Sequence, residues 1–294
     1  MKKNLLLLLI PVISLAGCKK NVVPEPNELN PYEEYDNVFL LMGQSNASGN
    51  APWSFLETSN PEVYAKYSEG NDKVQISYDN YHTVETNYGP TKFGQADHAT
   101  LFGPEIGMAE TISANYESAY IVKAALGGSC LQTQYVDKHG NKYELYNRFV
   151  LFIKNQVEKL EEMGKKPRIR GVFWMQGESD SSDSLCNTYA KATQNFYDYL
   201  RTDLNKWIFG HFNFVDAYIS TSSHYWKNPT VVNEAKQYVA DHNEHCYCIK
   251  TNGEDASAIS LTLKSQTGQG DDDAHYDAQS MLLLGQTAGT YIIK

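Results

Sequence analysis

Val38-Phe39-Leu40-Leu41-Met42-Gly43-Gln44-Ser45-Asn46 is a continuous apolar run that passes directly into a small polar turn. An apolar run that ends at a glycine is typical of a strand buried on both faces of a parallel sheet. Similar runs at 119–126, 169–175 and 212–219 predict further strands, and a weaker run at 258–263 is a candidate fifth strand.

Segments with helical periodicity lie between the predicted strands. Apolar residues recur at helical spacing in 105–115, 143–163, 184–204, 233–242 and 276–293. Strands that alternate with helices predict an α/β fold, a three-layer α/β/α sandwich around a mostly parallel sheet. The stretch 49–102 lacks this alternation and is predicted to be an elaborate loop beside the site.

The N-terminus has the layout of an export signal. Met1-Lys2-Lys3 is basic, Leu5 to Ile10 is apolar without a break, and Leu15-Ala16-Gly17-Cys18 ends in small residues and a cysteine. This order is that of a secretory signal peptide, and the apolar run is too short to span a bilayer. An ordinary signal peptide that happens to contain Cys18 is the alternative to a lipoprotein signal.

Small residues that end on a cysteine resemble the bacterial lipobox. The resemblance implies that the signal peptide 1–17 is removed and that Cys18 is lipidated, which predicts export and a membrane anchor on the periplasmic or cell-surface side of the bacterial envelope. The proline-containing segment 18–36 is predicted to be a tether. Residues 37–294 are then long enough for one domain with a substantial core.

Charge and cysteine content narrow the function further. The formal net charge is −10, and removal of Lys2 and Lys3 with the signal peptide brings it to −12. An acidic chain is a poor candidate for nucleic-acid binding, which needs basic patches. Export permits disulfides among Cys130, Cys186, Cys246 and Cys248, but their spacing does not fix a pairing.

Polar segments follow the predicted strands. The first strand is followed by Gly43-Gln44-Ser45-Asn46, the second by Gly127-Gly128-Ser129 and the third by Gln176-Gly177-Glu178-Ser179-Asp180. A fourth segment, Asp271-Asp272-Asp273-Ala274-His275, precedes the last helix. Because ligands bind at the carboxyl ends of parallel strands, we expect these segments to meet in one site.

Together the segments contain the groups that acyl transfer requires. Ser45 is a candidate nucleophile, since His275 could accept its proton. Asp272, or its neighbour Asp273, could orient the imidazole and stabilise the imidazolium. Taken singly, each segment also has an ordinary explanation: a turn, a strand exit, or an aspartate cluster that is solvated or binds calcium. The order of the segments favours a site.

Negative charge on a carbonyl oxygen needs donors that are already in position. The backbone N–H groups of Ser45 and Gly128 and the side-chain amide of Gln176 are the candidates. Glu178 could orient His275 or fix Gln176, and we favour a supporting role. No metal or cofactor is required by this set of residues.

Four blocks carry a family resemblance. The segments 43–46, 127–129, 174–180 and 272–275 resemble the successive blocks of the SGNH/GDSL hydrolase superfamily, most closely its sialate O-acetylesterase and acetylxylan esterase branch, carbohydrate esterase family six. The most specific block is Trp174-Met175-Gln176-Gly177-Glu178-Ser179-Asp180. The resemblance extends from about residue 37 to the C-terminus and implies the SGNH hydrolase fold with its flavodoxin-like sheet.

The resemblance also implies an activity, removal of O-acetyl groups from carbohydrate without a cofactor. It implies Ser45 as the nucleophile, Asp272 and His275 as the rest of the triad, and Gly128 and Gln176 as oxyanion partners. Because three aspartates are adjacent, Asp273 remains an alternative acid or a supporting residue. Glu105, in a further block, is expected to have a structural role.

The substrate and the rival functions stay open. Sialic acid and xylan-type polysaccharides are both candidate carriers of the acetyl group. Aromatic side chains in 49–102 could stack on sugar or simply pack: Trp53, Tyr64, Tyr67, Tyr78, Tyr81 and Tyr88. Cations that could meet a sialate carboxylate are Lys66, Lys73, Lys92 and Arg148. The rivals are a non-catalytic surface glycan-binding lipoprotein on the same fold and a metal-dependent hydrolase using His242, His245, Cys246 and Cys248.

Overall fold

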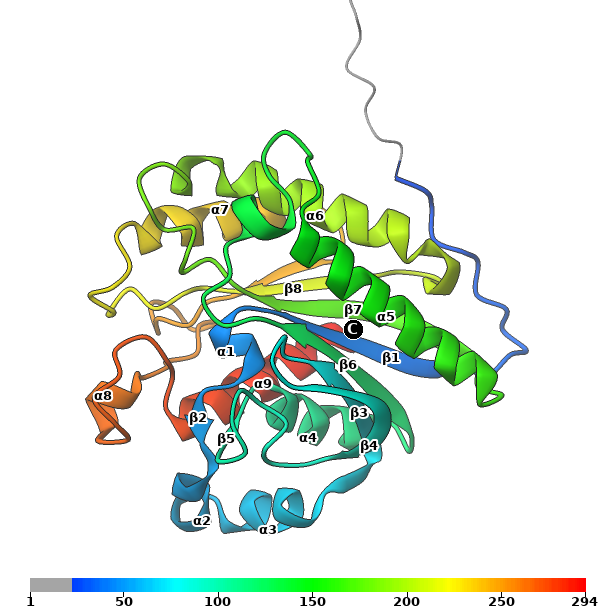
Figure 1. The fold of residues 1–294 in the computed structure, drawn as a ribbon, viewed down its shortest axis with the longest axis horizontal. Helices are drawn as coiled ribbons and strands as arrows, with labels where there is room; N and C mark the ends of the chain where they lie inside the picture. Colours follow the sequence, from blue (N-terminus) through cyan, green and yellow to red (C-terminus); the bar gives the residue numbers. More distant parts are fainter. Residues whose placement is uncertain (1–22) are drawn as a thin grey trace, which may run out of the picture.

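The computed structural model describes residues 23–294, so the predicted signal peptide 1–17 and the lipidation site Cys18 lie outside the described residues. A seven-stranded sheet in the order β4-β3-β6-β1-β7-β8-β9 forms the centre of the domain (Figure 1). Neighbouring strands are parallel except β3 and β4, which are antiparallel. The prediction of a mostly parallel α/β sheet is confirmed.

The strands of the large sheet are β1 (Asp36–Gly43), β3 (Asn71–Asp79), β4 (Val84–Thr91), β6 (Ala119–Ala125), β7 (Pro167–Met175), β8 (Asn213–Ala217) and β9 (Cys246–Ile249). A small second sheet pairs β2 (Ala51–Pro52) with β5 (Leu101–Phe102). Residues 38–42 of β1 are completely buried, as their unbroken apolar run requires. This strand lies between β6 and β7 at the centre of the sheet.

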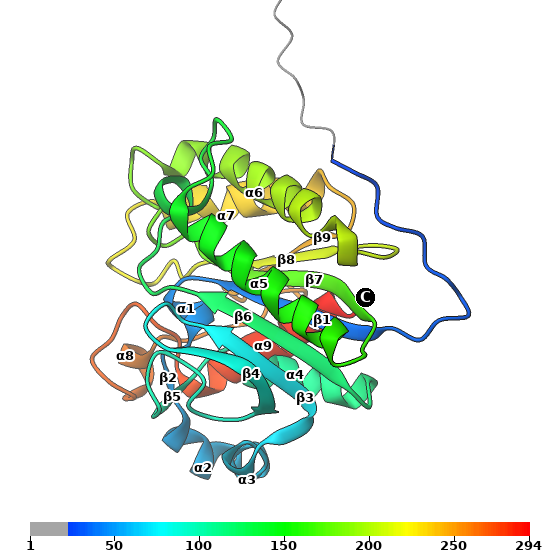
Figure 2. The same cartoon turned by 45° about the vertical axis from the view of Figure 1, so that its right-hand side comes forward.

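Helices cover both faces of the sheet, which completes the three layers (Figures 1 and 2). One face carries α5 (Glu144–Glu162), α6 (Tyr189–Asp203) and α7 (Pro229–Asp241), and the other carries α4 (Glu105–Asn115) and α9 (Ala278–Ile292). The short helices are α1 (Ser45–Ser48), α2 (Leu56–Ser59), α3 (Pro61–Glu69) and α8 (Lys264–Thr267). Short turns complete the chain: η1 (Trp53–Phe55), η2 (Leu131–Tyr135), η3 (Cys186–Thr188) and η4 (Asn205–Trp207).

The topology places a crevice at the end of β1. Without the inserted strands β3 and β4, the parallel strands lie in the spatial order β6-β1-β7-β8-β9, which is the flavodoxin-like order 2-1-3-4-5. Connections leave in opposite directions on the two sides of β1, so the sheet's switch point lies there. Gly43 pairs with both Ala125 and Met175, and these three strands therefore end at one level.

Only glycine fits at the end of β1. Gly43 has a φ of +145°, and a Cβ atom added there would lie 2.0 Å from the carbonyl oxygen of Met175. The close approach of β1 to β7 brings the turn that begins at Gly43 next to the segment that follows Met175.

Two sequence predictions about the fold are wrong. The stretch 49–102 is not a loop but an insertion that contains α2, α3 and the β3–β4 hairpin, and β3 extends the sheet beside β6. Its edge strand β4 is largely exposed, so it lacks the apolar pattern of an inner strand. The weak strand at 258–263 has only isolated bridges, and the last parallel strand is instead the short β9.

The described part of the predicted tether contacts the domain. Asn27 bridges to Phe209, and its side-chain amide donates to the carbonyl oxygens of Asn205 (2.6 Å) and Ile208 (2.9 Å). The Tyr35 ring lies 5.0 Å from that of Phe209. Polar bonds and one ring contact hold this segment, which is why apolar periodicity does not reveal it.

Two further observations concern cysteines and membrane helices. None of the four cysteines between residues 23 and 294 forms a disulfide, so Cys130, Cys186, Cys246 and Cys248 are free thiols. Over the same residues, every helix is too short or too polar to cross a membrane.

Candidate active site

The three strand-end segments meet as expected from the parallel sheet. The Leu126 N–H donates to Gly43 O (3.1 Å), and the Gln44 N–H donates to Met175 O (2.9 Å). A Cβ atom added to Gly127 would lie 3.7 Å from that of Ser45. Backbone contacts between neighbouring strands therefore bring Ser45 beside both other segments.

Asn46 ties the histidine segment to this edge. Its Nδ2 donates to Glu178 Oε1 (2.9 Å) and Ala274 O (3.4 Å), and its Oδ1 accepts from the Tyr276 N–H (3.4 Å). Ala274 and Tyr276 flank His275, so the residue after Ser45 fixes both sides of the histidine. The only sequence signal for this role is the place of Asn46 in the Ser45 motif.

The two adjacent aspartates have different partners. Asp272 Oδ2 lies 2.8 Å from His275 Nδ1, and Asp272 Oδ1 accepts from the backbone N–H of His275 (3.2 Å). Asp273 instead accepts from the His224 N–H (2.8 Å) and Ser265 Oγ (2.9 Å). Asp272 is therefore the aspartate that can orient the His275 ring. Asp273 instead connects the loop that contains His224 to the segment that contains His275.

Lys264 is a residue of this network that sequence reasoning missed. Its Nζ lies 2.5 Å from Asp272 Oδ2 and donates to Asn50 O (3.1 Å). Burial raises the pKa of Asp272, but hydrogen bonds from Lys264 and His275 outweigh it and lower that pKa to about 2. Asp272 is thus a carboxylate at neutral pH. No spacing rule in the sequence links Lys264 to it.

The groups that would face a substrate are open. Ser45 is half-buried, and within residues 23–294 its Oγ makes no hydrogen bond, including none to His275. Hydrogen bonds of this kind often tighten only when substrate binds. In the same part of the chain, the backbone N–H groups of Ser45 and Gly128 have no acceptor. Gly128 is exposed with a φ of +70°, and a Cβ atom there would touch nothing within 4 Å.

Gln176 lies in a buried hydrogen-bond network beside the site. Its side chain is completely buried, and its Nε2 donates to Asp180 Oδ2 (2.7 Å) and Ser129 O (3.1 Å). Its Oε1 accepts from the Tyr189 hydroxyl (2.9 Å). Both amide hydrogens of Gln176 have acceptors in this structure, and a role as a third oxyanion donor stays a prediction. Through Ser129 O it also fixes the residue next to Gly128.

Glu178 and Lys236 lie beneath the site. Glu178 is buried, which raises the pKa of its carboxyl group, and it accepts from Asn46 rather than from His275. Lys236 Nζ lies 2.5 Å from both Gln176 O and Asp216 Oδ1. Burial raises the pKa of Asp216 to about 6 against the opposing effect of Lys236. These buried groups hold the loop after β7 in place.

Comparison with known proteins now identifies the family. Residues 35–294 match a protein family described as "Carbohydrate esterase, sialic acid-specific acetylesterase". The chain belongs to this family. No curated protein sequence matches this carbohydrate esterase.

Solved structures support the fold of the esterase. A protein from Arabidopsis thaliana has a TM-score of 0.63 at 20% identity, with 89% of this chain and 99% of that chain covered. NanS has a TM-score of 0.62 at 14% identity, with coverage of 92% and 98%. A carbohydrate acetylesterase from Xanthomonas citri has a TM-score of 0.53 at 13% identity, with coverage of 86% and 54%. At these identities the similarity concerns the fold.

Most of these aromatic residues of the esterase's insertion pack against other rings. Trp53, Tyr64 and Tyr67 surround Phe93, with ring centroids 5.8–6.3 Å from it. The Tyr88 ring meets that of Tyr120 at 5.1 Å. Tyr81 differs, because the residue is 40% exposed and lines a cavity.

The candidate cations of the esterase are also distributed unevenly. Lys66 pairs with Glu110, and Lys73 with Glu117. Arg148 pairs with Asp79 and lines the same cavity as Tyr81. Lys92 donates its backbone N–H to Gln95 Oε1.

The histidines and cysteines of the rival metal site point to separate partners. His242 Nδ1 lies 2.8 Å from Tyr238 O, and the His245 ring stacks on His211 at 4.7 Å. Across residues 23–294, no three His, Cys, Asp or Glu side chains are grouped to hold a metal ion. The donor set proposed from the sequence therefore does not converge.

Proposed function

We propose that this carbohydrate esterase removes O-acetyl groups from glycans through an acyl-enzyme, with Ser45 as nucleophile, His275 as general base and Asp272 as its orienting acid. The observation that carries the proposal is the 2.8 Å contact between Asp272 and His275 in a segment that Asn46 ties to Ser45. A nucleophile, a base and an oriented carboxylate in this order make up a hydrolytic triad.

The first step forms the acyl-enzyme. Ser45 Oγ attacks the acetyl carbonyl carbon while His275 takes its proton, and Asp272, ionised because its pKa is about 2, stabilises the imidazolium. The negative charge moves to the carbonyl oxygen. The free backbone N–H groups of Ser45 and Gly128 are the donors available to it. His275 then returns the proton to the departing sugar oxygen, which leaves an acetyl ester on Ser45.

The second step releases acetate. A water molecule gives its proton to His275 and attacks the acetyl ester, and the same two donors stabilise the second oxyanion. Collapse of this intermediate breaks the bond to Ser45 Oγ, which takes the proton back from His275. Gln176 contributes by holding Ser129 and, through it, the loop that presents Gly128.

Hydrolysis by residues 19–294, the chain without the predicted signal peptide and Cys18, tests the proposal. The protein should release acetate from p-nitrophenyl acetate and from acetylated sugars. Ser45→Ala should lower the rate by several orders of magnitude. Unchanged hydrolysis by Ser45→Ala would contradict the assignment, and glycan binding without any turnover would support the non-catalytic rival instead.

We further propose that the enzyme is exported and anchored at the cell envelope through lipidated Cys18. The order of basic, apolar and small residues before Cys18 supports this. Cys18→Ala should move the protein from the membrane fraction to a soluble fraction. An unchanged membrane fraction would contradict the anchor without affecting the proposed chemistry.

A further inference from the structure

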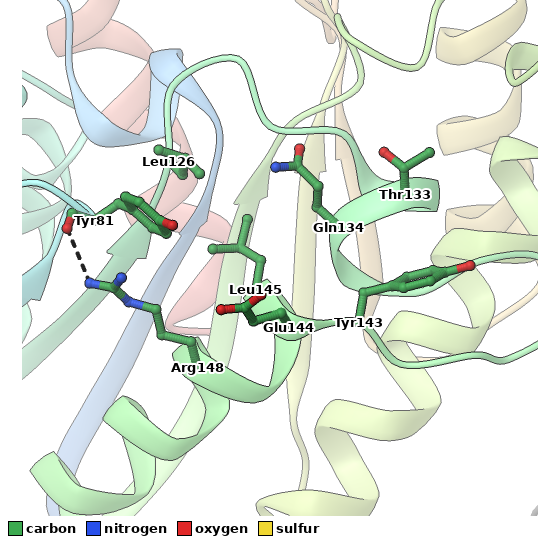
Figure 3. A pocket seen from close by; sticks show the side chains of 8 residues that line it. All are labelled: Tyr81, Leu126, Thr133, Gln134, Tyr143, Glu144, Leu145 and Arg148. Atoms are coloured by element: carbon green, nitrogen blue, oxygen red, sulfur yellow. Dashed lines mark hydrogen bonds between the residues drawn. The ribbon is translucent and has the colours of Figure 1, made fainter.

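A cavity of about 320 Å³ adjoins the proposed active site, a volume at the lower end of pockets that hold small organic ligands. It lies between the Tyr81 turn, the loop after β6, η2 and the start of α5 (Figure 3). Leu126 lines the cavity, its N–H donates to Gly43 O, and it directly precedes Gly127. Leu126 therefore links the cavity lining to the strand edge, where the next residue, Gly127, lies beside Ser45.

Tyr81 presents a fixed aromatic face to this cavity. Its φ of +66° is one that a tyrosine rarely adopts, so its surroundings must hold it there. Its N–H donates to Asp79 Oδ1 (2.8 Å), and its ring lies 4.2 Å from the guanidinium of Arg148. Arg148 in turn donates to both Asp79 oxygens at 3.0 Å and to Tyr81 O at 3.1 Å. Tyr81 is thus held in place although the residue is 40% exposed.

Polar groups surround this aromatic face. Gln134 Oε1 accepts from the Cys130 N–H (2.8 Å), and within residues 23–294 the amide hydrogens of Gln134 have no acceptor. Glu144, at the start of α5, is exposed and lines the cavity (Figure 3). Sugar hydroxyls both donate and accept, so one sugar ring could bond to the Gln134 amide and the Glu144 carboxylate while its C–H face covers Tyr81.

The charge balance of the cavity favours a neutral sugar. The Arg148 cation is already paired with both oxygens of Asp79, whose side chain is 5% exposed. Glu144, four residues before Arg148 on α5, also interacts electrostatically with that cation, so one positive charge faces two carboxylates and the charges of this group sum to −1. A carboxylate ligand would be repelled by Glu144 and would compete with Asp79 for Arg148.

We propose that this cavity binds a neutral sugar unit next to the acetylated one, so that the enzyme acts on acetylated oligosaccharides in preference to free acetylated monosaccharides. The inference rests on the proposed function, since the cavity matters only if the neighbouring acetyl ester reaches Ser45. An oligosaccharide gains the contacts with Tyr81, Gln134 and Glu144, which a monosaccharide seated at Ser45 lacks. The acetylated unit itself is xylose-like or a sialic acid, and the assay distinguishes these sources.

Two matched substrate pairs test the proposal. One pair is acetylated xylose and acetylated xylotriose; the other is O-acetyl sialic acid and O-acetyl sialyllactose, in which neutral lactose is the neighbour. In at least one pair we expect the oligosaccharide to have a KM about tenfold lower, the scale expected of one well-formed aromatic contact. Equal KM values within both pairs would overturn the proposal.

Variants at Tyr81 link this gain to the cavity. Tyr81→Gly adopts the positive φ without strain and should abolish the oligosaccharide advantage, whereas Tyr81→Phe should keep it. Tyr32→Ala, at a tyrosine that is 95% exposed in the N-terminal segment, is the control and should also keep it. If Tyr81→Gly does not fold, Tyr81→Asn replaces it, because asparagine tolerates this conformation. A retained advantage in the folded variant would contradict the proposal.

Glu144→Gln distinguishes a neutral from an acidic occupant. With a neutral sugar in the cavity, the variant should raise the KM of the oligosaccharide severalfold and leave that of free O-acetyl sialic acid unchanged. A severalfold fall in the latter KM would show that an acidic sugar occupies the cavity. Hydrolysis of p-nitrophenyl acetate should be unchanged in these variants; its persistence in Ser45→Ala would instead contradict the proposed function.

Discussion

The carboxyl edge of β1, β6 and β7 and the inserted segment 49–102 are built on different principles. At the edge, the buried side chains are polar, and each has specific partners: Asn46, Gln176 and Glu178 are at most 2% exposed and hydrogen-bonded. In the insertion, aromatic rings pack around Phe93. Polar networks fix positions and angles, whereas ring packing mainly contributes stability.

This difference separates two kinds of substitution. A change at the strand edge should alter turnover more than folding, because it moves a group that faces the reacting ester. A change in the Phe93 cluster should alter folding more than turnover. Tyr81 is the exception within the insertion, since its exposed ring belongs to the cavity beside the edge.

The largest expected effect is at the adjacent aspartates. Asp272→Asn should lower kcat with p-nitrophenyl acetate by about 10⁴-fold, as loss of the orienting carboxylate does in other triad enzymes. Asp273→Asn is the matched control and should cost less than about tenfold, because Asp273 contacts His224 and Ser265 rather than His275. A larger loss of kcat for Asp273→Asn than for Asp272→Asn would show that Asp273 is the orienting acid.

Asn46→Ala should have the next largest effect, about a 10²-fold fall in kcat, the scale of a small misplacement of a reacting group. Asn46 fixes both neighbours of His275, so its loss frees the base to move away from Ser45. Asn233 is the matched control, because it is also a buried asparagine that bonds to backbone. Its Oδ1 accepts from the Ile219 N–H, and its Nδ2 donates to Ile219 O. Asn233→Ala should reduce stability to a similar degree with turnover retained. Equal turnover in the two variants would remove the distinction between edge and scaffold.

The strand-edge residues could be predicted because the chemistry follows from local order. An unbroken apolar run predicts a buried strand, and the residues that follow it must lie at the carboxyl edge of the sheet. This rule predicts the positions of Ser45, Gly128 and the segment 176–180. Lys264 and the hydrogen bonds of Gln176 could not be found in this way. They depend on contacts between segments far apart in the sequence, and an amide has no preferred partner until the loops are packed.

The insertion could not be predicted for a related reason. Its strand β4 is mostly exposed and β3 is only partly apolar, so neither has the pattern of an inner strand. Aromatic residues give the same signal whether they pack or bind sugar. The structure separates Phe93 and its neighbours from Tyr81 through exposure, which sequence alone does not contain.

Phe93→Ala tests whether the aromatic cluster of the insertion contributes stability rather than turnover. Removal of this ring should lower the free energy of unfolding by up to about 3 kcal/mol, less than for a completely buried phenylalanine because Phe93 is partly exposed. Phe55, in the same insertion but 41% exposed, is the control, and Phe55→Ala should change stability by about 0.5 kcal/mol or less. Turnover per folded molecule should be unchanged in both. A large loss of turnover in Phe93→Ala would extend the functional region into the insertion.

The smallest effect is expected at Lys264, and its sign depends on pH. The pKa of Asp272 is about 2, below its ordinary value, so the ionised carboxylate stabilises the folded state. That contribution is complete above the ordinary aspartate pKa of about 4 and is lost as the pH falls through about 2. Lys264→Met removes a partner of Asp272 and should lower stability by up to about 1 kcal/mol at pH 6.

Urea unfolding of wild type and Lys264→Met at pH 6, 4 and 2 measures this dependence. The difference between the two proteins should be present at pH 6 and 4 and should shrink towards pH 2, where Asp272 takes up a proton in both. Lys250→Met is a matched control, because Lys250 pairs with Asp255 (2.7 Å) in a more exposed ion pair and should give a smaller difference at pH 6. A Lys264→Met difference that is the same at all three pH values would mean that Lys264 stabilises the site through packing, and that Asp272 does not depend on it for its charge.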